Sequence, residues 1–132
     1  MSPAEVLEFL RDESWLVLAT LDADGSPFGD VVPAMLDGET LCFCVSRNGR
    51  SRANIARDDR VCCSTDRFPS YYEIKGVTVH GRAREFTDPA VVARIVPRCS
   101  ALGLEVGADR AVYALGLDDV SSFDFAKIRN KY

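Results

Sequence analysis

The chain has 132 residues, of which 47% are hydrophobic and 27% charged, a mixture that suits one globular domain spanning residues 1–132. No apolar run approaches the roughly 18 to 20 residues of a membrane span, and no secretory signal pattern begins the chain. The net charge of −4 argues against a nucleic-acid binder. The five cysteines show no disulfide or metal-ligand spacing, which argues against a secreted protein or a metal protein. We therefore expect a cytoplasmic protein.

The first half of the chain predicts a helix followed by a three-stranded meander. Ser2-Pro3-Ala4-Glu5 forms a capping box with proline at the first helical position, which is typical of a helix start. Strands are expected over residues 14–21, 27–36 and 40–45, separated by Asp22-Ala23-Asp24-Gly25 and by Asp37-Gly38. Tight turns between sequential strands imply an antiparallel sheet.

The second half adds two helices and three strands. A short helix is expected to end near Asp58-Asp59, and a second to begin at Pro89 and to end or kink at Pro97. The remaining strands are expected over residues 60–65, 72–86 and 111–117, followed by a turn-like tail over residues 118–125. These elements predict a mainly β (α+β) fold, in which six antiparallel strands close into a barrel that removes its own edges, with short flanking helices.

Positive charge is concentrated between Arg47 and Arg57, a stretch with four arginines and no acidic residue. The segment just ahead of the first of the two later helices therefore offers backbone N–H groups at a helix start, together with the side chains of Arg50, Ser51 and Arg52. This pattern indicates an anion site, most simply for a phosphate. The alternative is a solvated helix start whose arginines pair with Asp58 and Asp59.

Several short motifs surround this turn in a fixed order: Leu18 to Pro27, Val31-Val32-Pro33, Leu41-Cys42-Phe43, Arg50 to Ile55 with Asp59-Arg60-Val61, and Gly76 to Ala83. In their order and spacing the sequence resembles the flavin-binding split-barrel proteins related to pyridoxamine 5'-phosphate oxidase. The resemblance is strong from about residue 9 to residue 86 and weaker to residue 125.

The resemblance implies a six-stranded split barrel acting as a homodimer, with one FMN in each of two clefts between the subunits. It places the flavin ring along one set of residues and the phosphate on another: Val31, Val32, Pro33, Val45 and Ser46 for the ring, and Arg50, Ser51 and Arg52 for the phosphate. Tyr72 and Lys75 would approach from the partner. The implied activity is that of a flavin-dependent oxidoreductase without a catalytic side chain, whose second substrate is a nicotinamide nucleotide or another small molecule.

Two departures from the family pattern bear on the activity. The oxidase itself has an arginine and a lysine beside its ring-contacting strand and an arginine-rich C-terminal segment, whereas neither occurs around Val31 to Met35 or in Phe123 to Lys127. We therefore do not expect oxidation of vitamin B6. A deazaflavin coenzyme, an empty cleft, and a non-catalytic protein that stores or senses flavin or haem remain open alternatives.

Two other candidates for chemistry have simpler explanations. Cys42 and Cys44 lie on one strand face, but without a second ligand pair they are expected to be small buried hydrophobic residues. His80 is the only histidine, so any acid–base or haem-ligand role would fall to it. A structural role is the more common one for a lone histidine on a strand.

Overall fold

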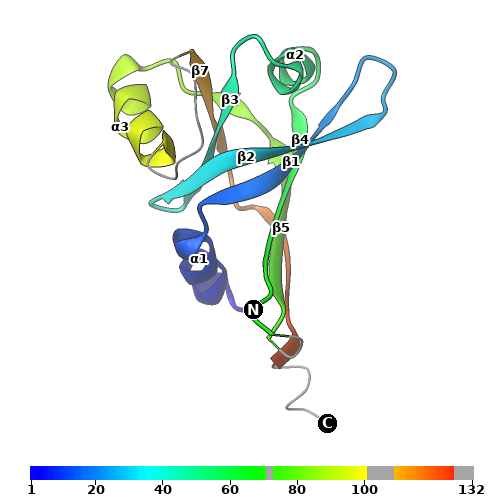
Figure 1. The fold of residues 1–132 in the computed structure, drawn as a ribbon, viewed down its shortest axis with the longest axis vertical. Coiled ribbons are helices and arrows are strands. Elements are labelled where there is room, and N and C mark those ends of the chain that lie inside the picture. Colours follow the sequence, from blue (N-terminus) through cyan, green and yellow to red (C-terminus); the bar gives the residue numbers. More distant parts are fainter. Residues whose placement is uncertain (71–72, 101–108, 127–132) are drawn as a thin grey trace.

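A computed structural model describes residues 1–70, 73–100 and 109–126, and the structural statements below refer to these residues. They form three helices, α1 (Pro3–Asp12), α2 (Arg50–Arg57) and α3 (Pro89–Ser100). The strands are β1 (Trp15–Leu21), β2 (Pro27–Asp37), β3 (Thr40–Ser46), β4 (Arg60–Arg67), β5 (Lys75–Arg82), β6 (Arg84–Glu85), β7 (Arg110–Leu115) and β8 (Asp119–Asp124). All strand pairs are antiparallel, in the order β6-β7-β3-β2-β1-β4-β5-β8. Figure 1 shows how strongly this sheet curls.

The two ends of the sheet are linked through the chain itself. Only Ala83 separates β5 from β6, so one nearly continuous stretch pairs with β4 and β8 through β5 and with β7 through β6. The amide of Ala83 donates to the carbonyl of Asp59 at 2.8 Å, which extends the β4–β5 register by one residue before the chain changes its partner to β7. The curl encloses most of the hydrophobic core.

The expected mainly β, antiparallel class with short helices is confirmed, but the strands number eight rather than six. The long strand expected over residues 72–86 is divided at Ala83 into β5, which begins only at Lys75, and β6, which ends at Glu85; residue 72 lies outside the described part of the chain. The tail expected to be turn-like contains β8, in which Val120 and Ser122 alternate with more exposed neighbours and pair with β5. In addition, Pro97 does not end α3, which continues to Ser100.

The local signals at helix starts and turns are confirmed. Ser2 and Glu5 form both hydrogen bonds of the capping box of α1. Gly25 closes the β1–β2 hairpin with φ of +85°, and Gly38 closes the β2–β3 hairpin with φ of +62°, conformations that favour glycine. These turns set the register of the meander.

Two hydrophobic clusters hold the elements together. The larger lies inside the curl, where α1 contributes Val6, Phe9 and Leu10. The smaller lies on the opposite face, where Ile95 of α3 packs against a group of buried residues that confirms the expected burial of two cysteines: Met35, Cys42, Cys44 and Val112. In the described part of the chain no group of three or more potential ligands could hold a metal ion. None of the helices there is long and apolar enough to cross a lipid bilayer.

Replacing Ile95 with alanine tests the attachment of α3. Ile95 is fully buried, so its truncation leaves a cavity and should lower the free energy of unfolding by about 2 to 5 kcal/mol. The control is Arg98→Ala on the exposed side of the same helix, which should change stability by no more than about 0.5 kcal/mol. Urea denaturation of both variants makes the comparison, and equal effects would mean that α3 does not depend on Ile95.

Candidate functional site

The candidate site lies where β2 and β3 stop pairing. Their ladder ends at the pair Ala34 and Phe43. Beyond it, β2 continues alongside β1 as far as Pro27, while β3 continues alongside β7 as far as Ser46. The edges of the two strands therefore face one another without pairing, and α2 begins just after this separation.

The start of α2 has the features of an anion site. Gly49 is the N-cap residue and offers no side chain to the free N–H groups of the first turn, which contains no acidic residue. A Cβ atom at Gly49 would lie 3.3 Å from the carbonyl oxygen of Ser46, so a larger residue would crowd the turn. The N-terminal end of the helix dipole is therefore left without a local capping group.

Arg50, the first residue of α2, is held by Asp22 of the β1–β2 turn. Its Nε lies 2.9 Å from Asp22 Oδ1, and its Nη2 contacts Oδ2, which makes a bidentate pair. The guanidinium group also lies 4.2 Å from the centre of the Phe28 ring. Asp22 in turn accepts a hydrogen bond from Asn54 Nδ2 at 2.9 Å.

The second turn residue, Ser51, points inward. Its side chain is almost fully buried, and its hydroxyl donates to Asp30 Oδ2 at 3.0 Å. Asn54, equally buried, donates to Thr20 Oγ1 at 3.0 Å and so ties α2 to β1. The buried side of α2 therefore carries two hydrogen-bonded polar side chains beside the apolar Ile55, which packs into the core.

Arg52 and Arg47 share Glu85 of β6. Arg52 Nη1 lies 2.5 Å from Glu85 Oε1 and 3.2 Å from the Tyr113 hydroxyl. Arg47 lies 3.7 Å from Glu85 Oε2 and 3.1 Å from Asp109 Oδ1. Each of the three arginines that precede or open α2 thus has a carboxylate partner.

The sequence alone also allowed these arginines to pair with Asp58 and Asp59, but in the structure both acids have other partners. Asp58 pairs with Arg60 instead, through a contact of 2.6 Å. Asp59 pairs with Arg82, also at 2.6 Å. The arginines at the start of α2 are held by acids from other elements, and not by the acids that follow the helix.

The predicted ring-contacting residues divide into two groups. Val31 and Ser46 are exposed, and the side chain of Val31 is 55% accessible. The side chains of Val32, Pro33 and Val45 are buried in the core, so only their backbone groups can face a ligand at the separation of the strands. Val31, Val32 and Pro33 lie on the part of β2 that has separated from β3, and Val45 and Ser46 lie at the end of β3 that leads to α2.

Within one chain, Lys75 lies away from the other predicted cofactor residues at the start of α2. It begins β5, and its Nζ lies 3.9 Å from Asp124 Oδ2. β5 runs from the side of the N-terminus toward α2 (Figure 1), and the seven steps from Arg82 back to Lys75 span about 23 Å. Tyr72 lies outside the described residues. His80 is exposed, opposite Cys62 on one neighbouring strand and Asp119 on the other.

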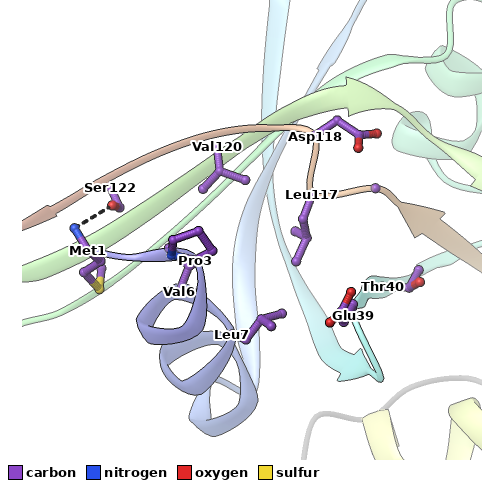
Figure 2. A pocket seen from close by; sticks show the side chains of 11 residues that line it. Met1, Pro3, Val6, Leu7, Glu39, Thr40, Leu117, Asp118, Val120 and Ser122 are labelled. Atoms are coloured by element: carbon purple, nitrogen blue, oxygen red, sulfur yellow. Dashed lines mark hydrogen bonds between the residues drawn. The ribbon is translucent and has the colours of Figure 1, made fainter.

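A hollow of about 580 Å³ lies elsewhere, between α1, the β2–β3 turn and the connection from β7 to β8 (Figure 2). Its apolar lining comes from Val6, Leu7, Leu117 and Val120, and its carboxylates from Glu39 and Asp118. No arginine or lysine lines it, so it is not suited to a phosphate. Its position does not connect with the start of α2.

The structure adds residues that the sequence pattern did not single out. Asp22, Asp30 and Glu85 supply the carboxylates, while Asn54 and Tyr113 supply neutral partners. Asp22 could be recognised only as a turn residue, and Glu85 only as part of a strand. Nothing local in the sequence indicates that Asp22 and Glu85 meet the arginines, because they lie 28 and 33 positions from Arg50 and Arg52.

Comparisons with known proteins agree with this fold. Residues 2–132 match the family model described as pyridoxamine 5'-phosphate oxidase. A conserved hypothetical protein of Mycobacterium tuberculosis has a TM-score of 0.83 and 20% identity, over 98% of this chain and 88% of that chain. The FAD binding protein of Mycobacterium smegmatis has a TM-score of 0.74 and 16% identity, over 95% and 96% of the two chains. A heme binding protein of the same organism has a TM-score of 0.71 and 22% identity, over 96% of this chain and 61% of that chain.

At these identities the likeness to the solved structures establishes the fold alone. Among curated proteins none matches.

Acid titration tests the pair of Asp22 and Arg50. The hydrogen bonds from Arg50 and then Asn54 lower the pKa of Asp22 to about 2, from an ordinary value near 3.8. Because the folded pKa lies below the unfolded one, the ionised carboxylate stabilises the fold above about pH 4, and this stabilisation is lost as the pH falls toward about 2. Asp22→Asn should therefore be less stable than the wild type at pH 7 and lose less stability between pH 4 and 2. Urea denaturation at pH 2.5, 4 and 7 measures this, with the exposed Asp118→Asn as control; parallel losses in wild type and Asp22→Asn would contradict it.

Proposed function

Because the chain belongs to the pyridoxamine 5'-phosphate oxidase family, we propose that it binds a flavin, most simply FMN, at the start of α2 and uses it for redox chemistry on a small molecule. The observation that carries the proposal is the uncapped start of α2, which lies beside unpaired strand edges and among Arg47, Arg50 and Arg52. The phosphate of a flavin needs a cationic helix start, and its ring needs a strand edge beside that start.

The residues fit an FMN phosphate through distinct contributions. Arg50 and Arg52 present planar donors that can bind two phosphate oxygens at once. Ser51 contributes through its backbone N–H, because its hydroxyl is buried and engaged with Asp30. The ring would lie against Val31 and Ser46 and along the backbone of Val32, Pro33 and Val45, where N–H and C=O groups can orient it.

A bound flavin would supply the electron and hydride chemistry, and the protein would supply binding and orientation. The described residues near α2 include no histidine or cysteine that could act as a nucleophile or base there. A nicotinamide nucleotide or another small molecule would bind in turn as the second substrate. The arginine and lysine that accompany the ring in the true oxidase have no counterpart on β2, so vitamin B6 remains an unfavoured substrate.

The proposed site needs a second copy of the chain. On the outer face of the sheet, Trp15, Val17 and Val31 are about half exposed, and Val17 lies directly opposite Val31. The same row continues across Ser64 and Thr78 without a charge. A patch of this kind is typical of a protein–protein contact, and a homodimer through it would cover the ring site and could bring Tyr72 and Lys75 of the partner toward it.

Deazaflavin and haem are the runner-up ligands, and a protein that only stores or senses its ligand is the non-catalytic alternative. The absorption spectrum of the purified protein separates the ligands, because flavin, deazaflavin and haem absorb at different wavelengths. Reduction of bound flavin by a nicotinamide nucleotide then separates an oxidoreductase from a binding protein. A Soret band instead of flavin bands would replace the proposal with haem binding.

Removing both arginines tests the phosphate contacts. The double variant Arg50→Ala/Arg52→Ala should bind FMN at least about tenfold more weakly, since a charge-assisted bond contributes roughly that factor or more. Riboflavin, which lacks the phosphate, should bind to the variant and to the wild type equally well. Fluorescence titration of both ligands makes the measurement, and Arg94→Ala is the matched control because its pair with Asp37 is similarly exposed. Unchanged FMN affinity in the double variant would remove the phosphate assignment.

A charge on the outer face tests the dimer. Val17→Asp places a carboxylate in the centre of the apolar row and should shift the protein from dimer to monomer in sedimentation velocity, with loss of flavin binding. Ala93→Asp, on the exposed side of α3, should leave both properties unchanged. A wild type that sediments as a monomer at every concentration would contradict the proposed assembly.

A further inference from the structure

The start of α2 is already neutralised by the protein itself. Around it, Arg47, Arg50 and Arg52 pair with the three carboxylates of Asp22, Glu85 and Asp109. A fourth carboxylate, that of Asp30, accepts the hydrogen bond of the Ser51 hydroxyl. A phosphate that binds here does not meet free cations. It meets cations that are already paired, and it must share them or replace their partners.

Asp22 and Glu85 are the two acids placed to compete most directly. The Asp22 side chain is 19% exposed and is fixed by Arg50 and by the buried Asn54. The Glu85 side chain is 27% exposed and bridges Arg52 and Arg47. Both carboxylates are held by two donors each, so they do not swing away freely when an anion arrives.

This arrangement lowers the gain from each phosphate contact. An arginine that turns from a carboxylate to a phosphate exchanges one charge-assisted hydrogen bond for another, and the net gain is the difference between them. The released carboxylate then remains close to a second anion in a partly buried place, where repulsion is only weakly screened. Phosphate binding therefore adds less affinity than the number of arginines suggests.

Building on the proposed function, we infer that Asp22 and Glu85 compete with the cofactor phosphate for Arg50 and Arg52, so that the flavin exchanges with flavin in solution. The flavin is then a dissociable cosubstrate and not a permanently held group. The two acids are specificity-determining residues: they reduce the advantage of a phosphorylated flavin over one without the phosphate. They touch the arginines, and they act on the ligand through them.

The test uses the full chain, stripped of any bound flavin, with FMN and riboflavin as probes. Asp22→Asn and Glu85→Gln remove each negative charge and keep a side chain of the same shape. Each variant should lower the Kd for FMN by about tenfold, the factor expected from one charge-assisted contact, and leave the Kd for riboflavin unchanged. Asp37→Asn is the matched control, because Asp37 pairs with Arg94 at 2.8 Å away from α2, and it should change neither Kd.

The outcomes separate this inference from the proposed function. Tighter FMN binding in the two variants, with riboflavin unaffected, supports the inference, even if the wild type itself discriminates poorly. If the wild type prefers FMN to riboflavin and the variants bind FMN no more tightly, the inference is wrong and the proposed site stands. If neither the wild type nor the variants distinguish the two flavins, both are wrong. Retention of FMN by the wild type through prolonged dialysis would also overturn the inference. Should Asp22→Asn fail to fold, as judged by its thermal midpoint, Glu85→Gln decides the question alone.

Discussion

The buried hydrogen bonds of Asn54 are the constraint on which the rest of the site depends. Asn54 lies on a helix of only eight residues, too short to be stable in isolation, and its amide reaches both Thr20 inside the sheet and Asp22 in the adjoining turn. Because these groups are buried, leaving any of them unpaired costs more than the bonds themselves contribute. α2 is therefore fixed in one position relative to β1 and to the β1–β2 turn.

The position of α2 determines which carboxylates pair with its arginines. With Asn54 docked on Thr20, the first turn of α2 faces the β1–β2 hairpin, and Arg50 lies against Asp22 while Ser51 lies against Asp30. On the other side, Arg52 faces the outer strands, where Tyr113 and Glu85 are neighbours across the β6–β7 pair. The same docking that creates a helix start suited to an anion also supplies carboxylates to its cations. The same arginine N–H groups that hold the helix in place would therefore also have to bind an external anion.

The sequence was informative where structure is decided locally. The capping box of Ser2 and Glu5 and the glycines at positions 25 and 38 predicted a helix start and two turns, since such features depend on neighbouring residues. The end of α2 near Asp58 was predicted for the same reason. The division of the long strand at Ala83 was not predicted, because it lies where the chain changes its partners from β4 and β8 to β7. β8 was missed because its alternation of exposed and half-buried residues is weak and its pairing with β5 is distant in sequence.

The candidate site shows the same limit more sharply. Helix position and local composition were enough to predict that Arg50, Ser51 and Arg52 gather at one turn, but composition overstated the charge available there. A run of arginines without acids in the sequence is not a region without acids in space, since Asp22 and Glu85 reach it from 28 and 33 positions away. If the affinity of the proposed site does not come mainly from the phosphate, it must come from burial of the ring, and the side chain of Val31 that would contact the ring is 55% exposed in the single chain. In the proposed dimer, the exposed row of Trp15, Val17 and Val31 would place a second subunit over the ring, and the neutralised arginines would chiefly orient the ligand.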